Sequence, residues 1–337
     1  MQPLIRDPRT DPHAIGDAVR LLNAGRLVAF PTETVYGLGA MAFDEAAVAC
    51  IFAAKGRPQD NPLILHLASA DDLQLIARDV PRVARELMAS FWPGPLTLVL
   101  RRQDRVPAGV TAGLDTVAVR VPDHPIALDL IRALGAPIAA PSANRSGRPS
   151  PTTAAHVAHD FGVNVPLILD GGSTLVGLES TVVDVTDRVP RLLRPGGISI
   201  EELRAVIGAV EWRPDDGAEA RAPGMRHRHY APSCRVVLAS PHEIAETIAR
   251  LLREGVCVGV LCHSELSVTD GLRFIRSITG SLSEYGREIF RAFRDADECG
   301  VEVLVVETVS EQGMGLAIMD RLTRAAAGSD QSLGLQG

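Results

Sequence analysis

The sequence predicts an α/β protein with two domains: a mixed-sheet domain over residues 1–210 and a small Rossmann-like parallel α/β domain over residues 235–337. A chain of 337 residues is longer than one ordinary hydrophobic core requires. Apolar runs of strand length alternate along it with amphipathic helical stretches. Residues 211–234 interrupt this alternation with a polar, proline-containing stretch, which is typical of a linker.

The first domain begins with two helices whose ends are marked in the sequence. Asp11 and Pro12 open a helix with one apolar face, and Gly25 ends it. Asp44 caps a second helix that stops at Lys55 and Gly56. Further helices are predicted over residues 83–91, 126–134 and 152–161, and strands over 27–30, 63–67, 96–100, 117–121, 137–140, 167–170 and 181–185.

The second domain alternates strands with helices. Strands are predicted over 235–239, 256–261 and 301–306, and helices over 243–252, 282–296 and 316–326. This order predicts a parallel sheet between two helical layers. We expect the tail from about residue 328 to be frayed.

Composition favours a cytoplasmic globular protein. Hydrophobic residues make up 46% of the chain, which indicates a packed core. The first residues lack the basic-then-apolar pattern of a signal peptide, and no apolar stretch approaches the ~20 residues that cross a bilayer. The five cysteines are scattered and never spaced Cys-x-x-Cys, so we expect reduced core thiols.

The negative charge is concentrated in the second part of the chain. The net charge is -7, of which residues 1–200 carry -1 and the remainder -6. An acidic second part argues against broad, sequence-independent binding of nucleic acid. Small anionic ligands of the first domain are the favoured partners.

The common nucleotide and hydrolase motifs are absent from the sequence. Neither a Gly-x-x-x-x-Gly-Lys-Ser/Thr loop nor a Gly-x-Gly-x-x-Gly turn after a strand occurs. There is also no Gly-x-Ser-x-Gly and no His-Glu-x-x-His. His227 and His229 lie in the linker, where such a pair is seldom a metal site. A nucleotide site in this protein would therefore have to use phosphate-binding loops of another kind.

Lys55 is the only lysine, and it stands two residues before Arg57 at a helix end. Lysine has a compact ammonium group and arginine a planar guanidinium with several donors, so the pair can bind phosphate groups. For an arbitrary Lys-Gly sequence, the better interpretation is a solvent-exposed lysine whose charge interacts favourably with the helix dipole, with the glycine ending the helix.

Four loops rich in hydroxyl, amide, arginine and glycine residues follow or precede predicted strands. In α/β folds, ligand sites collect at such loops. Any one of them could be only a turn, but four together indicate a site. They span Pro31–Ala40, Pro141–Ser150, Gly177–Thr181 and Leu193–Gly197.

Together, several runs of the sequence resemble the YrdC family, whose members are L-threonylcarbamoyladenylate synthases. The resemblance covers essentially the whole chain, because the linker run from Pro223 to Pro232 is similar to that of the family's long form. The combination is specific, whereas each run alone is weak. The other runs are Pro31–Ala40, Lys55–Arg57 with Pro62–Leu63, Pro93–Thr97, Ser142–Asn144 and Arg194–Gly196.

The resemblance implies a YrdC-like twisted mixed sheet with an open cleft, and a nucleotidyltransferase activity. L-Threonine, bicarbonate or CO2, and ATP would give threonylcarbamoyl-AMP and pyrophosphate, the first step of threonylcarbamoyladenosine modification in tRNAs that read codons starting with A. Magnesium would bridge phosphate oxygens without protein ligands. The downstream partner would be a tRNA threonylcarbamoyl-transfer complex, with weak or no direct tRNA binding and no membrane.

The resemblance also implies roles for particular residues. Lys55 and Arg57 would be catalytic, and Tyr230 on the linker would fold over the nucleotide. Arg120, in an apolar strand, would bind the threonine carboxylate, with a salt bridge to a core aspartate as the alternative. His66 alone would more often be a core histidine. The ATP residues would be Lys55, Arg57, Asn61, Thr116, Ser142, Asn144, Ser150, Arg194 and Tyr230, and the threonine residues Thr34, His66, Arg120, Ala140 and Ser180.

Two rival functions come from different classes. One is a carbamoyl transferase like the related domain of hydrogenase-maturation proteins, but the acylphosphatase-like segment and zinc-finger cysteines of those proteins are not visible in this sequence. The other is an RNA-binding module, which the near-neutral first domain and the few aromatic residues disfavour.

Overall fold

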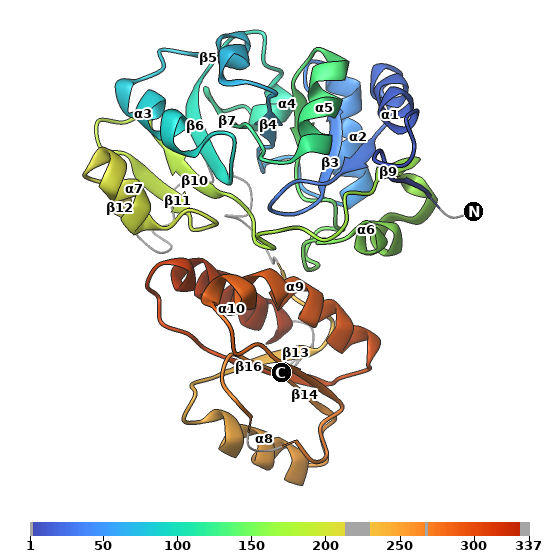
Figure 1. The fold of residues 1–337 in the computed structure, drawn as a ribbon, viewed down its shortest axis with the longest axis vertical. Helices are drawn as coiled ribbons and strands as arrows, with labels where there is room; N and C mark the ends of the chain where they lie inside the picture. The colour runs from blue at the N-terminus through green and yellow to red at the C-terminus, as the bar shows by residue number, and fades with distance from the viewer. Residues whose placement is uncertain (1–2, 213–229, 267–268, 331–337) are drawn as a thin grey trace. The chain divides into compact units, whose positions relative to one another are not determined.

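The computed structural model describes residues 3–212, 230–266 and 269–330, and these form two compact units. The first unit holds the described residues up to 212 except residues 147–150. The second unit holds residues 147–150 and the described residues from 230 onward. Each unit has its own sheet (Figure 1).

The first unit contains a mixed sheet of twelve strands among the described residues, as predicted (Figure 1). β4 and β7 run parallel near its middle, whereas β8 runs antiparallel to β4 and β6 runs antiparallel to β7. The strand order is β1 (Leu4–Arg6), β9 (Leu167–Leu169), β2 (Val28–Phe30), β3 (Gly37–Met41), β8 (Ile138–Ala140), β4 (Ile64–His66), β7 (Thr116–Arg120), β6 (Leu96–Arg102), β10 (Thr181–Asp184), β11 (Arg191–Arg194) and β12 (Glu211–Trp212), and β5 (Ala77–Arg78) pairs with β6.

The second helix of this unit has the ends that the sequence predicts. The Asp44 side chain accepts hydrogen bonds from the backbone amides of Ala46 and Ala47, and Gly56 adopts the left-handed conformation with φ 60°. Lys55 therefore sits on the last helical turn, directly before a sharp change of chain direction. The helices are α1 (Ala14–Asn23), α2 (Glu45–Lys55), α3 (Arg82–Phe91), α4 (Ala108–Thr111), α5 (Pro125–Leu134), α6 (Ala154–Phe161) and α7 (Ile200–Ile207), with 3-10 turns at Ala70–Leu75 and Gly162–Asn164.

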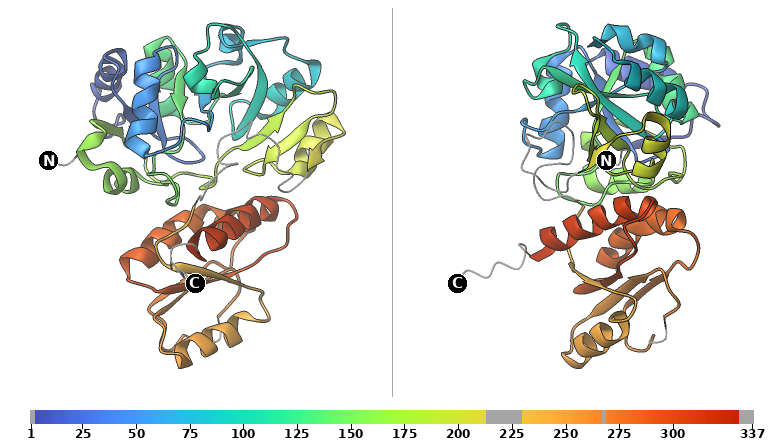
Figure 2. Two further views of the ribbon diagram at one scale, coloured as in Figure 1. Left: turned by 180° about the vertical axis from the view of Figure 1, so that it is seen from behind. Right: turned by 90° about the vertical axis from the view of Figure 1, so that its left-hand side faces the viewer.

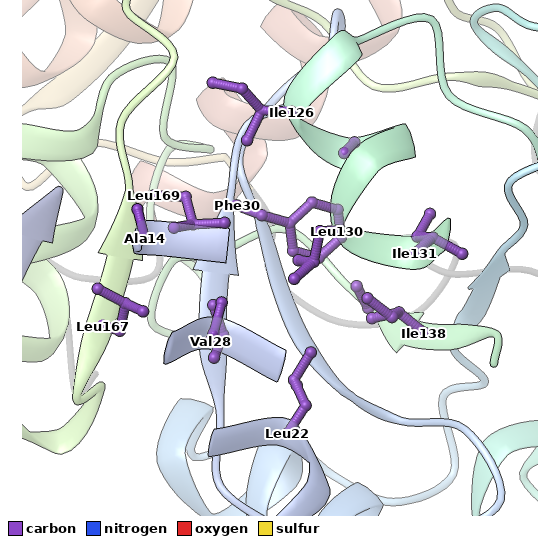
Figure 3. Close-up of a cluster of buried hydrophobic side chains, with 13 residues drawn as sticks. Ala14, Leu22, Val28, Phe30, Ile126, Leu130, Ile131, Ile138, Leu167 and Leu169 are labelled. Carbon is purple, nitrogen blue, oxygen red and sulfur yellow. The ribbon is translucent and has the colours of Figure 1, made fainter. Parts of the chain in front are cut away.

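A core cluster joins α1 and α5 to the sheet (Figure 3). Leu22 and Leu130 come from the two helices, and Phe30 and Ile138 come from β2 and β8. Gly39 of β3 makes the close approach possible, because a Cβ there would lie 2.9 Å from both Ile138 Cγ2 and Phe30 Cε1. This packing fixes β2, β3 and β8, whose ends carry two of the predicted site loops.

The second unit is a parallel sheet between helices, which confirms the predicted three-layer domain. In Figures 1 and 2, α8 covers one face of the sheet and α9 and α10 cover the other. All of its strand pairs are parallel. The strands, in sheet order, are β13 (Arg235–Ala239), β16 (Val303–Glu307), β14 (Val258–Cys262) and β15 (Phe274–Ser277), and the helices are α8 (Ile244–Arg253), α9 (Leu282–Glu298) and α10 (Met314–Asp330).

Several predictions about the chain need correction. The stretch Pro31–Ala40 is not all loop, because Gly37–Met41 forms β3. The linker was expected from residue 211, but Glu211 and Trp212 pair with β11 as β12. The rest of that predicted linker up to residue 229 lies outside the described residues. The sequence did not predict β1, β3, β5, β11, β12, β15, α4 or α7.

Two expectations about the chain end and the thiols also change. Helix α10 continues to Asp330, past the predicted start of a frayed tail at about 328, and residues 331–337 lie outside the described part. Cys234 and Cys262 are buried as expected, but Cys50 and Cys299 are exposed. Within the described ranges, we find no helix with the length and apolar character needed to cross a bilayer.

Candidate functional site

Lys55 joins the end of α2 to the loop that follows β8. Its ammonium donates hydrogen bonds to the backbone carbonyls of Ser142, at 2.7 Å, and of Asn144. The Ser142 hydroxyl in turn donates to Asn144 Oδ1 at 2.5 Å. The predicted Lys55 and Asn144, both buried, and the half-buried Ser142 thus form one group, in which neutral carbonyls orient the ammonium without neutralising its charge.

The environment of Lys55 disfavours its charged form. Burial, and then the nearby Arg57 charge, lower the pKa of Lys55 well below its usual value, whereas the charges of Asp160 and Glu179 act to raise it. An arriving anion would relieve this penalty.

Arg57 contacts the backbone just before β4. Its guanidinium donates to the carbonyls of Asn61, at 3.3 Å, and Pro62, at 3.1 Å. Asn61 is 1% exposed, and among the described residues its side-chain oxygen has no hydrogen-bond partner. Thr116 begins β7, and the parallel register of β4 with β7 places it beside this end of β4. The predicted Arg57, Asn61 and Thr116 therefore lie together.

Three of the predicted threonine residues, Thr34, His66 and Arg120, lie at the other end of these two strands. His66 and Arg120 end β4 and β7, and they are direct register partners. Arg120 Nη1 donates to the Thr34 hydroxyl at 3.0 Å. The predicted Ala140 does not join them, because β8 runs antiparallel to β4 and pairs Ala140 with Ile64 at the start of β4, whereas Ile138 pairs with His66.

Arg120 combines features of both interpretations that the sequence allows. It is 3% exposed and lies 3.6 Å from a carboxylate oxygen of Glu33, so a buried ion pair exists, although with a glutamate and not an aspartate. This distance is longer than a hydrogen bond. Burial lowers the pKa of Arg120, and the Glu33 charge partly offsets that effect. Among the described residues, Arg120 Nε has no hydrogen-bond partner.

His66 is held neutral by its surroundings. Burial, followed by the charge of Arg120, lowers its pKa well below the usual 6.5. Its ring meets the Phe30 ring edge to face, with centroids 5.8 Å apart. The burial of His66 fits the alternative interpretation of a core histidine. As the register partner of Arg120, His66 also lies in the same group as the predicted threonine residues Thr34 and Arg120.

Ser180 and Arg194 form a third group, next to β6. Arg194 donates through Nε and Nη2 to the Ser180 carbonyl, at 3.1 and 2.9 Å, and also to the Ser180 hydroxyl. That hydroxyl lies 2.7 Å from the Thr97 hydroxyl in β6. Gly196 allows this approach, because a Cβ there would lie 2.3 Å from the backbone nitrogen of Thr181.

Two predicted nucleotide residues lie in the second unit. Ser150 belongs to its segment 147–150 and is fully buried. Tyr230 is 5% exposed, with its ring stacked on Phe290 at a centroid distance of 5.4 Å and the Arg321 guanidinium 5.2 Å from the ring centre. Tyr230 is thus anchored by that unit's own helices, and its role toward a nucleotide stays a prediction.

Sequence reasoning did not single out Glu33, Thr97 or Thr32. A chain of hydrogen bonds runs from Arg120 to the Thr34 hydroxyl and from there to the Thr32 hydroxyl. The Thr32 hydroxyl accepts from Thr34 because it donates its own proton to the Val35 carbonyl at 2.7 Å. The available signal was a carboxylate between two threonines directly after a buried strand. Its significance depends on Arg120, which is distant in the sequence.

Taken together, these observations define an α/β protein whose first unit buries several cationic side chains, which suit small anionic ligands. The family model described as telomere recombination (Sua5/YciO/YrdC) matches residues 20–196, and a model described as the C-terminal domain of threonylcarbamoyl-AMP synthase matches residues 198–327. The chain therefore belongs to the Sua5/YciO/YrdC family, in the long form of the threonylcarbamoyl-AMP synthases, which are nucleotidyltransferase enzymes.

Relatives of known name cover nearly the whole chain. The threonylcarbamoyl-AMP synthase of Pyrococcus abyssi is 49% identical over 92% of this chain and 93% of its own length. The Bacillus subtilis enzyme of that name is 45% identical over 95% and 94%. The crystal structure of P. abyssi Sua5 complexed with L-threonine superposes with a TM-score of 0.92 at 47% identity, covering 98% of each chain.

Proposed function

We propose that this protein makes threonylcarbamoyl-AMP and pyrophosphate from L-threonine, bicarbonate or CO2, and ATP. The observation that carries the proposal is the burial of four cationic side chains, Lys55, Arg57, Arg120 and Arg194, in the first unit. Such buried charges favour anionic ligands, and the three substrates bring a triphosphate and a carboxylate. The relatives named threonylcarbamoyl-AMP synthase, and the P. abyssi structure with L-threonine, support the choice of substrates.

The proposed chemistry has two balanced steps. The threonine ammonium gives up two protons to water, one before and one as its nitrogen adds to CO2, which gives a carbamate. A carbamate oxygen then bonds to the α-phosphorus of ATP while the bond from that phosphorus to the pyrophosphate oxygen breaks. Such a displacement depends on positioning and charge neutralisation more than on a protein nucleophile.

The resemblance to the family assigns the residues to these steps. Lys55 and Arg57, with Ser142 and Asn144, would neutralise charge on the phosphates, together with Arg194. Arg120 would bind the threonine carboxylate beside Thr34, His66 and Ser180. The remaining assignments are Asn61, Thr116, Ser150 and Tyr230 toward the nucleotide and Ala140 toward threonine.

Magnesium is proposed to bind through the phosphates of ATP. In the described part of the chain, no three His, Cys, Asp or Glu side chains gather as the ligands of a metal ion would. Magnesium gives up its waters reluctantly and takes phosphate oxygens as ligands, so a site on ATP needs few protein ligands. When bound, the ion would add charge neutralisation at the phosphates.

We further propose that the product supplies the threonylcarbamoyl group for tRNAs that read codons starting with A. A separate tRNA threonylcarbamoyl-transfer complex in the cytoplasm would use it. The first 200 residues carry a net charge of only -1, which supports weak or absent direct tRNA binding.

Pyrophosphate release measures the proposed function directly. We expect release only when threonine, bicarbonate and ATP are all present, with threonine preferred over serine. Release without threonine would contradict the proposal. Tight tRNA binding with a steep dependence on salt and no pyrophosphate release would favour the RNA-binding rival instead.

A further inference from the structure

Glu33 carries a buried carboxylate that the assignments above leave unused. It follows β2 in the first unit and is 3% exposed. Among the described residues, neither of its carboxylate oxygens has a hydrogen-bond partner. A buried carboxylate without hydrogen-bond donors is costly, because nothing replaces the water that it loses.

The backbone holds Glu33 firmly in this position. The Glu33 carbonyl accepts a hydrogen bond from the Val176 amide at 2.8 Å, and the Thr34 carbonyl accepts one from the Gly177 amide at 3.1 Å. The loop is therefore anchored on both sides of the side chain. The side chain therefore starts from a fixed backbone position inside the unit.

Arg120 compensates the Glu33 charge only in part. Arg120 Nη1 lies 3.6 Å from Glu33 Oε1, which is beyond hydrogen-bonding distance, and it donates instead to Thr34. The Glu33 carboxylate and the Arg120 guanidinium thus lie side by side. Among the described residues, three of their atoms have no hydrogen-bond partner: Glu33 Oε1, Glu33 Oε2 and Arg120 Nε. A ligand with an anionic group for Arg120 and a positively charged hydrogen-bond donor for Glu33 would satisfy both side chains.

We propose that Glu33 binds the ammonium group of the amino acid whose carboxylate binds Arg120. An α-amino acid carries its two charges on adjacent carbon atoms, which matches two opposite protein charges in direct proximity. The proposal rests on the proposed function, because it deepens the amino-acid site of that reaction. It makes Glu33 a substrate-binding residue that fixes the position of the reacting nitrogen.

The test is a thermodynamic cycle between Glu33 and the ligand's nitrogen. Calorimetry on the full chain would compare L-threonine with 2,3-dihydroxybutanoate, in which a hydroxyl replaces the ammonium. We expect the wild-type protein to prefer threonine by about tenfold or more, the typical value of a charge-assisted hydrogen bond. In Glu33→Gln this preference should fall to about twofold or less.

A structural role of Glu33 gives a different result. If Glu33 served only to hold Arg120, Glu33→Gln would weaken both ligands by the same factor and leave the preference unchanged, which would overturn the proposal. The control Asp184→Asn changes another buried carboxylate, at the far end of β10, and should keep the wild-type preference.

The wild-type measurement alone keeps the inference falsifiable if Glu33→Gln does not fold. Equal affinity of the wild-type protein for the two ligands would overturn the ammonium site while leaving the proposed function intact. A wild-type protein that binds no threonine, with or without ATP, would overturn the proposed function and this inference with it.

Discussion

Lys55 Nζ lies 2.7 Å from the carbonyl oxygen of Ser142, which is 87 residues further along the chain. This hydrogen bond ties the end of α2 to the loop after β8, two segments that sequence reasoning could assign to one site only by resemblance. It also means that Lys55 has two tasks. It shapes the loop that carries Ser142 and Asn144, and it brings positive charge to that loop.

Replacing Lys55 by methionine should therefore cost both stability and activity. Lys55→Met leaves the buried carbonyls of Ser142 and Asn144 without their donor, at a cost of about 1–3 kcal/mol each. Urea unfolding should show this loss, and pyrophosphate release should disappear even at temperatures where the variant is folded. The exposed Arg26→Met is a matched control, and it should change stability by no more than about 0.5 kcal/mol. An active Lys55→Met would refute the assigned role.

The stability of the protein should fall in acid because of His66. Its folded-state pKa lies well below 6.5, owing to burial and then to Arg120, so below pH 6.5 the unfolded chain binds a proton that the folded chain refuses. His66 therefore stabilises the fold fully above pH 6.5, and this contribution is lost as the pH falls, at up to about 1.4 kcal/mol per pH unit.

Urea unfolding between pH 5 and 8 would measure this slope. His66→Gln should have a flatter dependence of unfolding free energy on pH than the wild-type protein. His124, whose pKa is also lowered by burial, remains in both proteins and so cancels in the comparison. Identical slopes would show that His66 takes up its proton normally in the folded state.

How much of the molecule the sequence predicts depends on how local the signals are. The ends of α2 follow from Asp44 and Gly56 alone, because capping and a left-handed stop are local interactions. Strand β3 escaped prediction because its glycines are explained only by Phe30 and Ile138, which pack against them from other strands.

The candidate site divides in the same way. The resemblance supplied Lys55 and Arg120 as ligand-binding residues, and the structure places each in a buried polar group. Glu33 and Thr97 could not be found in this manner, because their polar neighbours Arg120 and Ser180 are brought to them by the sheet. A polar residue next to a strand has no visible partner until the strand order is known.

Thr97 should act on threonine binding through Ser180. Its hydroxyl lies 2.7 Å from that of Ser180, so Thr97→Val keeps the shape of the side chain but removes the hydrogen bond that orients Ser180. We expect threonine affinity to fall by about three- to tenfold, with ATP affinity unchanged. Calorimetry with each ligand separates the two effects. Thr186→Val, just beyond the other end of β10, should leave both affinities unaltered, and an unchanged threonine affinity in Thr97→Val would contradict the assignment of Ser180 to the amino acid.

Gly196 and Gly16 offer a matched pair of substitutions with opposite expected effects. A Cβ at Gly196 would lie 2.3 Å from the Thr181 nitrogen and 2.4 Å from the Glu179 carbonyl oxygen, so Gly196→Ala forces the backbone beside Ser180 and Arg194 to move. We expect it to destabilise the protein by about 1–3 kcal/mol, as overpacking does, and to lower the rate of pyrophosphate release. Gly16 lies in α1 with no atom near its would-be Cβ, so Gly16→Ala should stabilise the helix by about 0.5–1 kcal/mol and keep full activity. Urea unfolding and pyrophosphate release on both variants would check this, and a Gly196→Ala protein as stable and active as the wild type would show that the loop after β11 does not fix the position of Arg194.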